Sequence, residues 1–146
     1  MTHADAYHDN IVIMLELIWG KGYMAPGGPG NVSKILDGID VHDKRILDIG
    51  CGIGGPAFEM ARTHGANVVG IDLEVPLVDR ATQAAATLGL SDKCIFQAVQ
   101  AGPLPFADQS FDIVISSGGF TQIEDKAAIL GESWHVLKPR GISELL

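Results

Sequence analysis

Short apolar runs alternate with longer amphipathic stretches from Lys44 onward. Brief runs rich in Ile, Val and Leu are typical of buried strands, and apolar residues that return every three or four positions are typical of helices. The pattern predicts strands in RILDIG, NVVGIDL, CIFQAV and FDIVISS. It predicts helices from Pro56 towards Gly65, in PLVDRATQAAATLG ending near Gly89, and in EDKAAILGESWHVL.

Two further helices are expected before this region. Apolar residues at helical spacing predict a helix from about Asp5 to Trp19, which Gly20 would end. GKGYMAPGGPG follows as a loop, and NVSKILDGI is expected to form a short helix that begins at Asn31. We therefore expect one domain over residues 1–146, with a helical lid in 1–43 and a core in 44–146.

Alternation of strands with helices predicts the α/β class, a Rossmann-like parallel sheet with right-handed crossovers. Ligands of such sheets bind beyond the carboxyl ends of the strands, where the strand order reverses. The residues that follow the strands are therefore the first candidates for a binding site. They are Asp48 to Gly55, Asp72 with Leu73, Gln100 with Ala101, and Ser117 to Phe120.

Composition narrows the classes of function. The 146 residues are 47% apolar, enough for one core, and the net charge of −8 without Lys/Arg clusters argues against a nucleic-acid partner. IVIMLELIWG is too short to span a membrane and contains Glu16, and MTHADAYHDN lacks the basic start of a signal peptide. A cytoplasmic protein is expected, in which Cys51 and Cys94 remain unpaired thiols.

The stretch LDIGCGIGG carries the main chemical signal. Gly50, Gly52 and Gly55 match the G-x-G-x-x-G spacing of dinucleotide sites, where backbone amides approach a pyrophosphate. Asp48 stands two residues before the first glycine, and a carboxylate there opposes a phosphate. It suits a cation instead, and S-adenosylmethionine has a sulfonium, an ammonium and no phosphate. Asp72, 18 residues after Gly54, suits the ribose hydroxyls of either ligand.

With these motifs, the chain resembles the class I S-adenosylmethionine-dependent methyltransferases. Their first motif, D-x-G-x-G-x-G, is matched by Asp48, Gly50, Gly52 and Gly54, and LPFADQSFDIVIS and VLKPRG also resemble that class. The front end YHDNIVIMLELIWGKGYMAPGG is similar to phosphoethanolamine N-methyltransferases. The resemblance runs over residues 7–141 and implies S-adenosyl-L-methionine as the cofactor and no metal.

The resemblance also implies the residues that hold this cofactor. Ala25 stands where a serine is common, which removes one polar contact. Gln100 stands where the family usually has an Asp that accepts from the adenine amino group, and its amide oxygen can still accept. The implied cofactor-binding residues are Met24, Ala25, Asp48, Gly50, Cys51, Gly52, Asp72, Leu73, Gln100, Ala101 and Ser117.

The residues expected to catalyse the reaction match the family pattern less completely than those expected to bind the cofactor. Methyl transfer needs alignment of the two reactants and exclusion of water, and an ammonium substrate must first lose a proton. The phosphobase enzymes use a Tyr at the position of Tyr7 and a His that aligns with Gln122, and glutamine has no titratable proton to exchange. Tyr7 and Gln122 are therefore the catalytic candidates, although Tyr7 equally fits an aromatic residue on an amphipathic helix.

The family sheet has seven strands in the order 3-2-1-4-5-7-6, and the pattern here supplies four, in the order 3-2-1-4. FDIVISS would then be an exposed apolar edge strand, which predicts a homo-oligomer formed over it. Two main functions stay open. The chain is a truncated methyltransferase for a small molecule, with a phosphobase amine as the candidate, or a non-catalytic module that binds S-adenosylmethionine or assembles through that edge. A nicotinamide oxidoreductase fragment is a third, disfavoured by Asp48.

Overall fold

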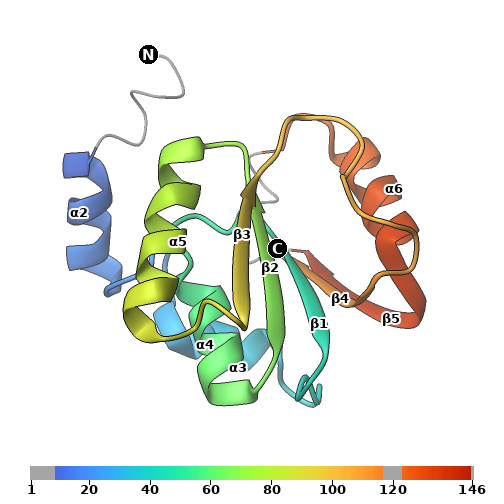
Figure 1. Cartoon of the computed structure of the whole chain (residues 1–146), viewed down its shortest axis with the longest axis horizontal. Helices are drawn as coiled ribbons and strands as arrows, with labels where there is room; N and C mark the ends of the chain where they lie inside the picture. Colours follow the sequence, from blue (N-terminus) through green and yellow to red (C-terminus); the bar gives the residue numbers. More distant parts are fainter. Residues whose placement is uncertain (1–8, 117–122, 146) are drawn as a thin grey trace.

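A parallel sheet forms the centre of the molecule (Figure 1). The computed structural model describes residues 9–116 and 123–145. Within them the sheet has five strands in the order β3-β2-β1-β4-β5, and every neighbouring pair is parallel. The strands are β1 (Arg45–Ile49), β2 (Asn67–Asp72), β3 (Cys94–Ala98), β4 (Phe111–Ser116) and β5 (Leu137–Leu145). The predicted α/β class and the order 3-2-1-4 are confirmed.

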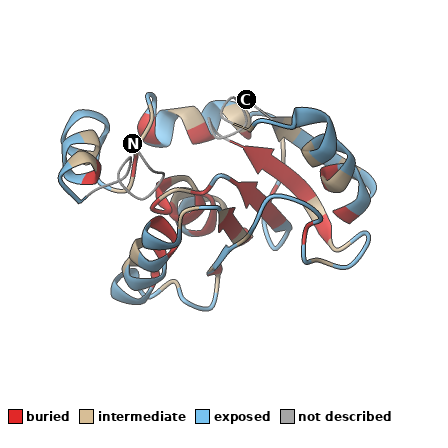
Figure 2. Cartoon of the chain, turned by 90° about the horizontal axis from the view of Figure 1, so that it is seen from above, coloured by how far each residue is buried: buried red, intermediate tan, exposed pale blue. Residues whose placement is uncertain are grey.

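Helices cover both faces of the sheet, as Figures 1 and 2 show. The helices α3, α4 and α5 contribute to the apolar layer on one face, and α6 to the layer on the other. Helix α2 stands beside α5, to which the ion pair between Arg80 and Asp9 joins it at 2.7 Å. None of the described helices is long and apolar enough to cross a membrane. Their bounds are α2 (Asp9–Trp19), α3 (Gly28–Ile35), α4 (Gly55–His64), α5 (Val75–Leu88) and α6 (Lys126–Val136).

The start of α3 differs from the sequence prediction. The helix begins at Gly28 rather than at Asn31, and its cap residue is Gly27, with a φ of 102°. Pro29 lies in the first turn of the helix. Backbone N–H groups there have no intrahelical acceptor, so the missing N–H of proline costs no hydrogen bond. The backbone N–H of Asn31 already donates to the Gly27 carbonyl at 3.1 Å. The Gly-Pro pair therefore starts the helix, and Asn31 lies inside it.

The predicted end of the sheet at the fourth strand is wrong. β5 pairs with β4 in parallel, so β4 is an interior strand and β5 lies at the edge. Phe111 pairs with Leu137 and Ile113 with Ile142, so the ladder shifts register across KPRG, where Arg140 has a φ of 66°. Pro139 and Gly141 interrupt the pairing without ending the strand. An oligomer formed over an open β4 edge therefore has no basis in this structure.

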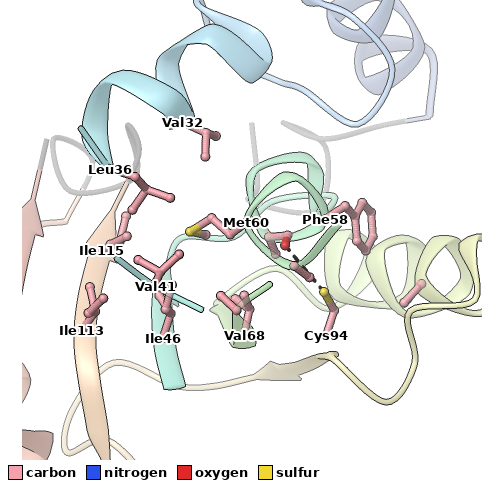
Figure 3. Close-up of a cluster of buried hydrophobic side chains, with 14 residues drawn as sticks. Val32, Leu36, Val41, Ile46, Phe58, Met60, Val68, Cys94, Ile113 and Ile115 are labelled. Carbon is pink, nitrogen blue, oxygen red and sulfur yellow. Dashed lines mark hydrogen bonds between the residues drawn. The ribbon is translucent and has the colours of Figure 1, made fainter. Parts of the chain in front are cut away.

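Two apolar layers enclose β1 and determine the surroundings of Asp48. Successive side chains of a strand point to opposite faces, and Ile46 belongs to the layer under α3, α4 and α5, which Figure 3 shows. Leu47 and Ile49 belong to the layer on the α6 side. Asp48 therefore faces the same side as Ile46, next to an apolar core. A carboxylate in that position loses contact with water.

Ser116 joins the carboxyl ends of β4 and β1. Its side chain is fully buried, and its hydroxyl donates to the Ile49 carbonyl at 2.8 Å. This carbonyl belongs to the residue immediately before the glycine loop. The hydroxyl therefore fixes the point at which the loop leaves the sheet.

We expect Ser116→Ala to destabilise the chain by about 1–2 kcal/mol, because a buried carbonyl loses its hydroxyl donor. Chemical denaturation followed by circular dichroism measures this change. The matched control is Ser133→Ala in α6, a buried serine whose hydroxyl donates to the Ile129 carbonyl within its own helix at 2.7 Å. That carbonyl keeps its helical backbone donor, so the control should cost less. Equal effects of the two substitutions would contradict the proposed role of Ser116.

Candidate ligand-binding site

The glycine loop between β1 and α4 folds against the end of β2. The backbone N–H groups of Gly50 and Cys51 both donate to the Ile71 carbonyl, at 2.8 and 3.0 Å. Gly50, Gly52 and Gly54 have φ values of 73°, 55° and 97°, a region that side chains with a Cβ rarely adopt. The three glycines thus give the loop its tight path. Gly54 and Gly55, where α4 begins, are themselves buried.

Asp72, at the end of β2, shapes the same loop. Its Oδ2 accepts a hydrogen bond from the Gly52 N–H at 3.0 Å, and its Oδ1 accepts one from the Glu74 N–H at 3.0 Å. A carboxylate oxygen can accept more than one hydrogen bond, so Asp72 retains acceptor capacity for a ligand. The sequence predicted a contact with a ribose and missed this second role. Asp72 thus also holds the glycine loop in place.

Asp48 is the most unusual group of the site. Its side chain has no exposed surface, and among the residues that the structure describes neither carboxylate oxygen has a hydrogen-bond partner. Burial and, as the smaller cause, the negative charge of Asp72 together raise the pKa of Asp48 to about 7. A buried, unpartnered carboxylate is costly when ionised. It therefore favours either a proton or a positively charged group of a ligand.

The loop of residues 20–27, here called the covering loop, lies on the glycine loop. The Gly55 N–H donates to the Gly22 carbonyl at 2.8 Å, and the Gly22 N–H donates to Glu16 Oε1, also at 2.8 Å. A Cβ atom added to Gly52 would lie 3.4 Å from the sulfur of Met24. The structure thus brings Met24 next to the glycines, on the side from which a ligand would be covered. The hydrogen bonds of Gly22 had no signal in the sequence.

The residues after β3 form a hollow beside Asp72. The Val99 N–H donates to the Asp72 carbonyl at 3.0 Å, so the two strand ends are directly joined. Leu73, which follows Asp72, exposes 56% of its side chain. The hollow has a volume of about 370 Å³ and is lined by Gln97, Ala98, Val99, Gln100, Ala101, Pro103 and Pro105. Gln100 and Ala101 are thus placed together at the end of β3.

The remaining candidates differ in what the structure shows of them. Cys51 is a buried free thiol in the glycine loop, and burial raises the pKa of this thiol above its usual range. Ala25 lies in the covering loop and is partly exposed. Tyr7, Ser117 and Gln122 lie outside the described residues. Among the described side chains, no three of His, Cys, Asp or Glu gather where they would hold a metal ion.

Together, the sheet order, the glycine loop and the two carboxylates define a Rossmann-like domain whose site suits a cationic nucleoside ligand. Comparison with known proteins names the class more narrowly. The profile of the family described as "Methyltransferase domain" matches residues 46–141. The chain belongs to this family.

Individual relatives point to the same class. Phosphoethanolamine N-methyltransferase 1 of Triticum aestivum is 32% identical over 136 residues, which cover 92% of this chain and 27% of the relative. Phosphoethanolamine N-methyltransferase 2 of Haemonchus contortus, solved with S-adenosyl-L-methionine, superimposes with a TM-score of 0.89 at 28% identity, covering 97% of this chain and 35% of that one. The [4+2]-cyclase SpnF also superimposes, with a TM-score of 0.75 at 29% identity, over 80% of this chain and 43% of its own. The chain thus spans about a quarter of the wheat relative's length.

Proposed function

We propose that this chain forms the cofactor-binding part of an S-adenosylmethionine-dependent methyltransferase that acts on a small molecule. The observation that carries the proposal is Asp48, a fully buried carboxylate at the start of a glycine loop that has no hydrogen-bond partner within residues 9–116 and 123–145. A pyrophosphate would place negative charge near this carboxylate, which is unfavourable at low dielectric. A ligand with a sulfonium and an ammonium places positive charge there instead.

The other residues of the site fit the remaining parts of such a ligand. The glycine loop allows close approach to the backbone near Asp48, and Asp72 offers acceptor capacity for ribose hydroxyls. Leu73 offers an exposed apolar surface for a base. Met24 and the covering loop close the site from the N-terminal side. The same proposal assigns five further residues to this site: Ala25, Gly50, Cys51, Ala101 and Ser117.

S-adenosylmethionine, when bound, supplies a methyl group on a sulfonium centre. The chain's own part is to orient the ligand, to neutralise its charge through Asp48 and to exclude water with the covering loop. We assign Tyr7 to accepting or orienting the acceptor's proton, and Gln122 to hydrogen bonding without proton exchange. A phosphobase amine is the proposed methyl acceptor, since the wheat and nematode relatives are named for phosphoethanolamine.

A second function is a module that binds S-adenosylmethionine without catalysing transfer. One observation favours it: Gln122, which stands where the phosphobase enzymes have a His, carries no titratable proton. The [4+2]-cyclase SpnF is a protein of similar fold whose name gives a different activity. The two functions share the cofactor site and differ in whether product forms.

Incubation with methyl-labelled S-adenosylmethionine and phosphoethanolamine separates the two functions. The methyltransferase predicts label in the phosphobase, and a Tyr7→Phe variant should then transfer label more slowly while binding the cofactor equally well. Cofactor binding without labelled product supports the module. Absence of cofactor binding in a folded chain contradicts both.

A further inference from the structure

The hollow at the end of β3 carries an inference about which base the site accepts, and this inference rests on the proposed function. The strand order places β2 between β1 and β3. A nucleoside that starts at the glycine loop after β1 and sets its ribose on Asp72 after β2 therefore has its base over the end of β3. The hydrogen bond from the Val99 N–H to the Asp72 carbonyl, 3.0 Å long, keeps these strand ends adjacent.

The polar side chains that line this hollow are amides. Gln97 and Gln100 are the only residues among the described lining set with polar side chains, and no acidic side chain is among them. Gln97 pairs with Ile71 inside the β-ladder, whereas Gln100 follows the end of β3. Gln100 is therefore the side chain placed to meet the edge of a base, next to Ala101.

An amide and a carboxylate read the edge of a purine differently. A carboxylate only accepts hydrogen bonds, so it selects a 6-amino group and repels a 6-oxo group. The amide of glutamine has an acceptor oxygen and a donor nitrogen, and a half-turn about its last torsion exchanges the two. One orientation accepts from a 6-amino group, and the other donates to a 6-oxo group.

We propose that Gln100 makes the base subsite permissive, so that the chain binds 6-amino and 6-oxo purine nucleosides with similar affinity. The ligand class is a purine nucleoside with a homocysteine-type side chain. Specificity for the ligand then comes from the side chain and ribose, at Asp48 and Asp72, rather than from the base.

The test compares two ligands that differ only at the base, S-adenosylhomocysteine and S-inosylhomocysteine, by calorimetric titration of the whole chain. The wild-type dissociation constants should lie within about tenfold of each other. Gln100→Glu has the same shape and lacks the donor, so it should favour the adenosyl ligand by a further ten- to hundredfold, roughly. Gln97→Glu is the matched control, since it adds the same charge to the same hollow, and it should leave the ratio unchanged.

Two results overturn the inference while the proposed function stands. One is a wild-type preference for S-adenosylhomocysteine above about tenfold, and the other is a Gln100→Glu ratio equal to that of the wild type. Failure of the wild type to bind either ligand overturns the proposed function instead, and this inference with it.

Discussion

Replacing Asp48 with asparagine is expected to stabilise the ligand-free chain at pH 8 and, in the same protein, to weaken its binding of S-adenosylmethionine. Both effects follow from a fully buried carboxylate that has no hydrogen-bond partner in the described part of the chain. In the ligand-free state its charge has no compensation, so removing the charge helps folding. In the bound state the proposed ligand cations compensate it, so removing it costs affinity, by roughly ten- to hundredfold.

The pKa of Asp48 predicts how the stability of the ligand-free chain changes with pH, and therefore why Asp48→Asn should stabilise it at pH 8. The folded pKa of Asp48 is about 7, raised from the model-peptide value of 3.8, so between these values the folded state holds a proton that the unfolded state has lost. The stability contributed by this group is full below about pH 4 and is lost as the pH rises through 7. The total is roughly 4 kcal/mol. In Asp48→Asn this part of the pH dependence should disappear.

Denaturant melts at pH 5 and pH 8 measure the stability, and calorimetric titration with S-adenosylmethionine at pH 8 measures the binding. Asp79→Asn is the matched control, because Asp79 is exposed on α5 and loses the same charge. It should change neither quantity noticeably. An Asp48→Asn variant that is destabilised at pH 8, or that binds as tightly as the wild type, would contradict the role given to Asp48.

Gly55→Ala is expected to detach the covering loop from the glycine loop. Gly55 begins α4 with a φ that alanine can adopt, but a Cβ atom there would collide with the Gly22 carbonyl oxygen. The same carbonyl accepts the Gly55 N–H at 2.8 Å. Relief of the collision requires the covering loop to move, at a cost of about 1–3 kcal/mol. We expect faster proteolysis within residues 20–27 and weaker binding of the cofactor.

The matched control for this prediction is Gly30→Ala in α3. A Cβ atom at Gly30 would meet no described atom within 4 Å, and the residue lies inside a helix. Alanine should therefore be neutral or stabilise the chain by up to about 1 kcal/mol through helix propensity. Limited proteolysis and thermal melts on both variants measure the difference. The account of the covering loop fails if the two variants behave alike.

The sequence was sufficient for the core of the fold because its signals were local. The strand RILDIG and the helix that starts at Pro56 follow from apolar runs and from glycine and proline at their ends, and both are present. The position of Asp48 on a buried strand also follows from the alternation of its neighbours. The sequence pattern does not show that Asp48 lacks a hydrogen-bond partner, because this depends on which side chains reach the carboxylate from α4 and β2.

The errors occurred where a local signal competes with a long-range one. Pro139 and Gly141 are local signals for the end of a strand. The pairing with β4 nevertheless resumes at Ile142, after Arg140 with its φ of 66°. The contact of Gly22 with Gly55 joins residues far apart in the chain, and no periodicity reports it. Asn31 is a good helix cap by residue type, yet Gly27 and Pro29 start the helix earlier. The second role of Asp72, holding the Gly52 amide, depends on the same kind of distant contact.

Calorimetric titration of the chain with S-adenosylhomocysteine, alongside NAD, tests the central claim most directly. The proposed site predicts saturable binding of S-adenosylhomocysteine and none of NAD, because Asp48 opposes the pyrophosphate. Binding of NAD, or an intact fold that binds neither ligand, would contradict the account.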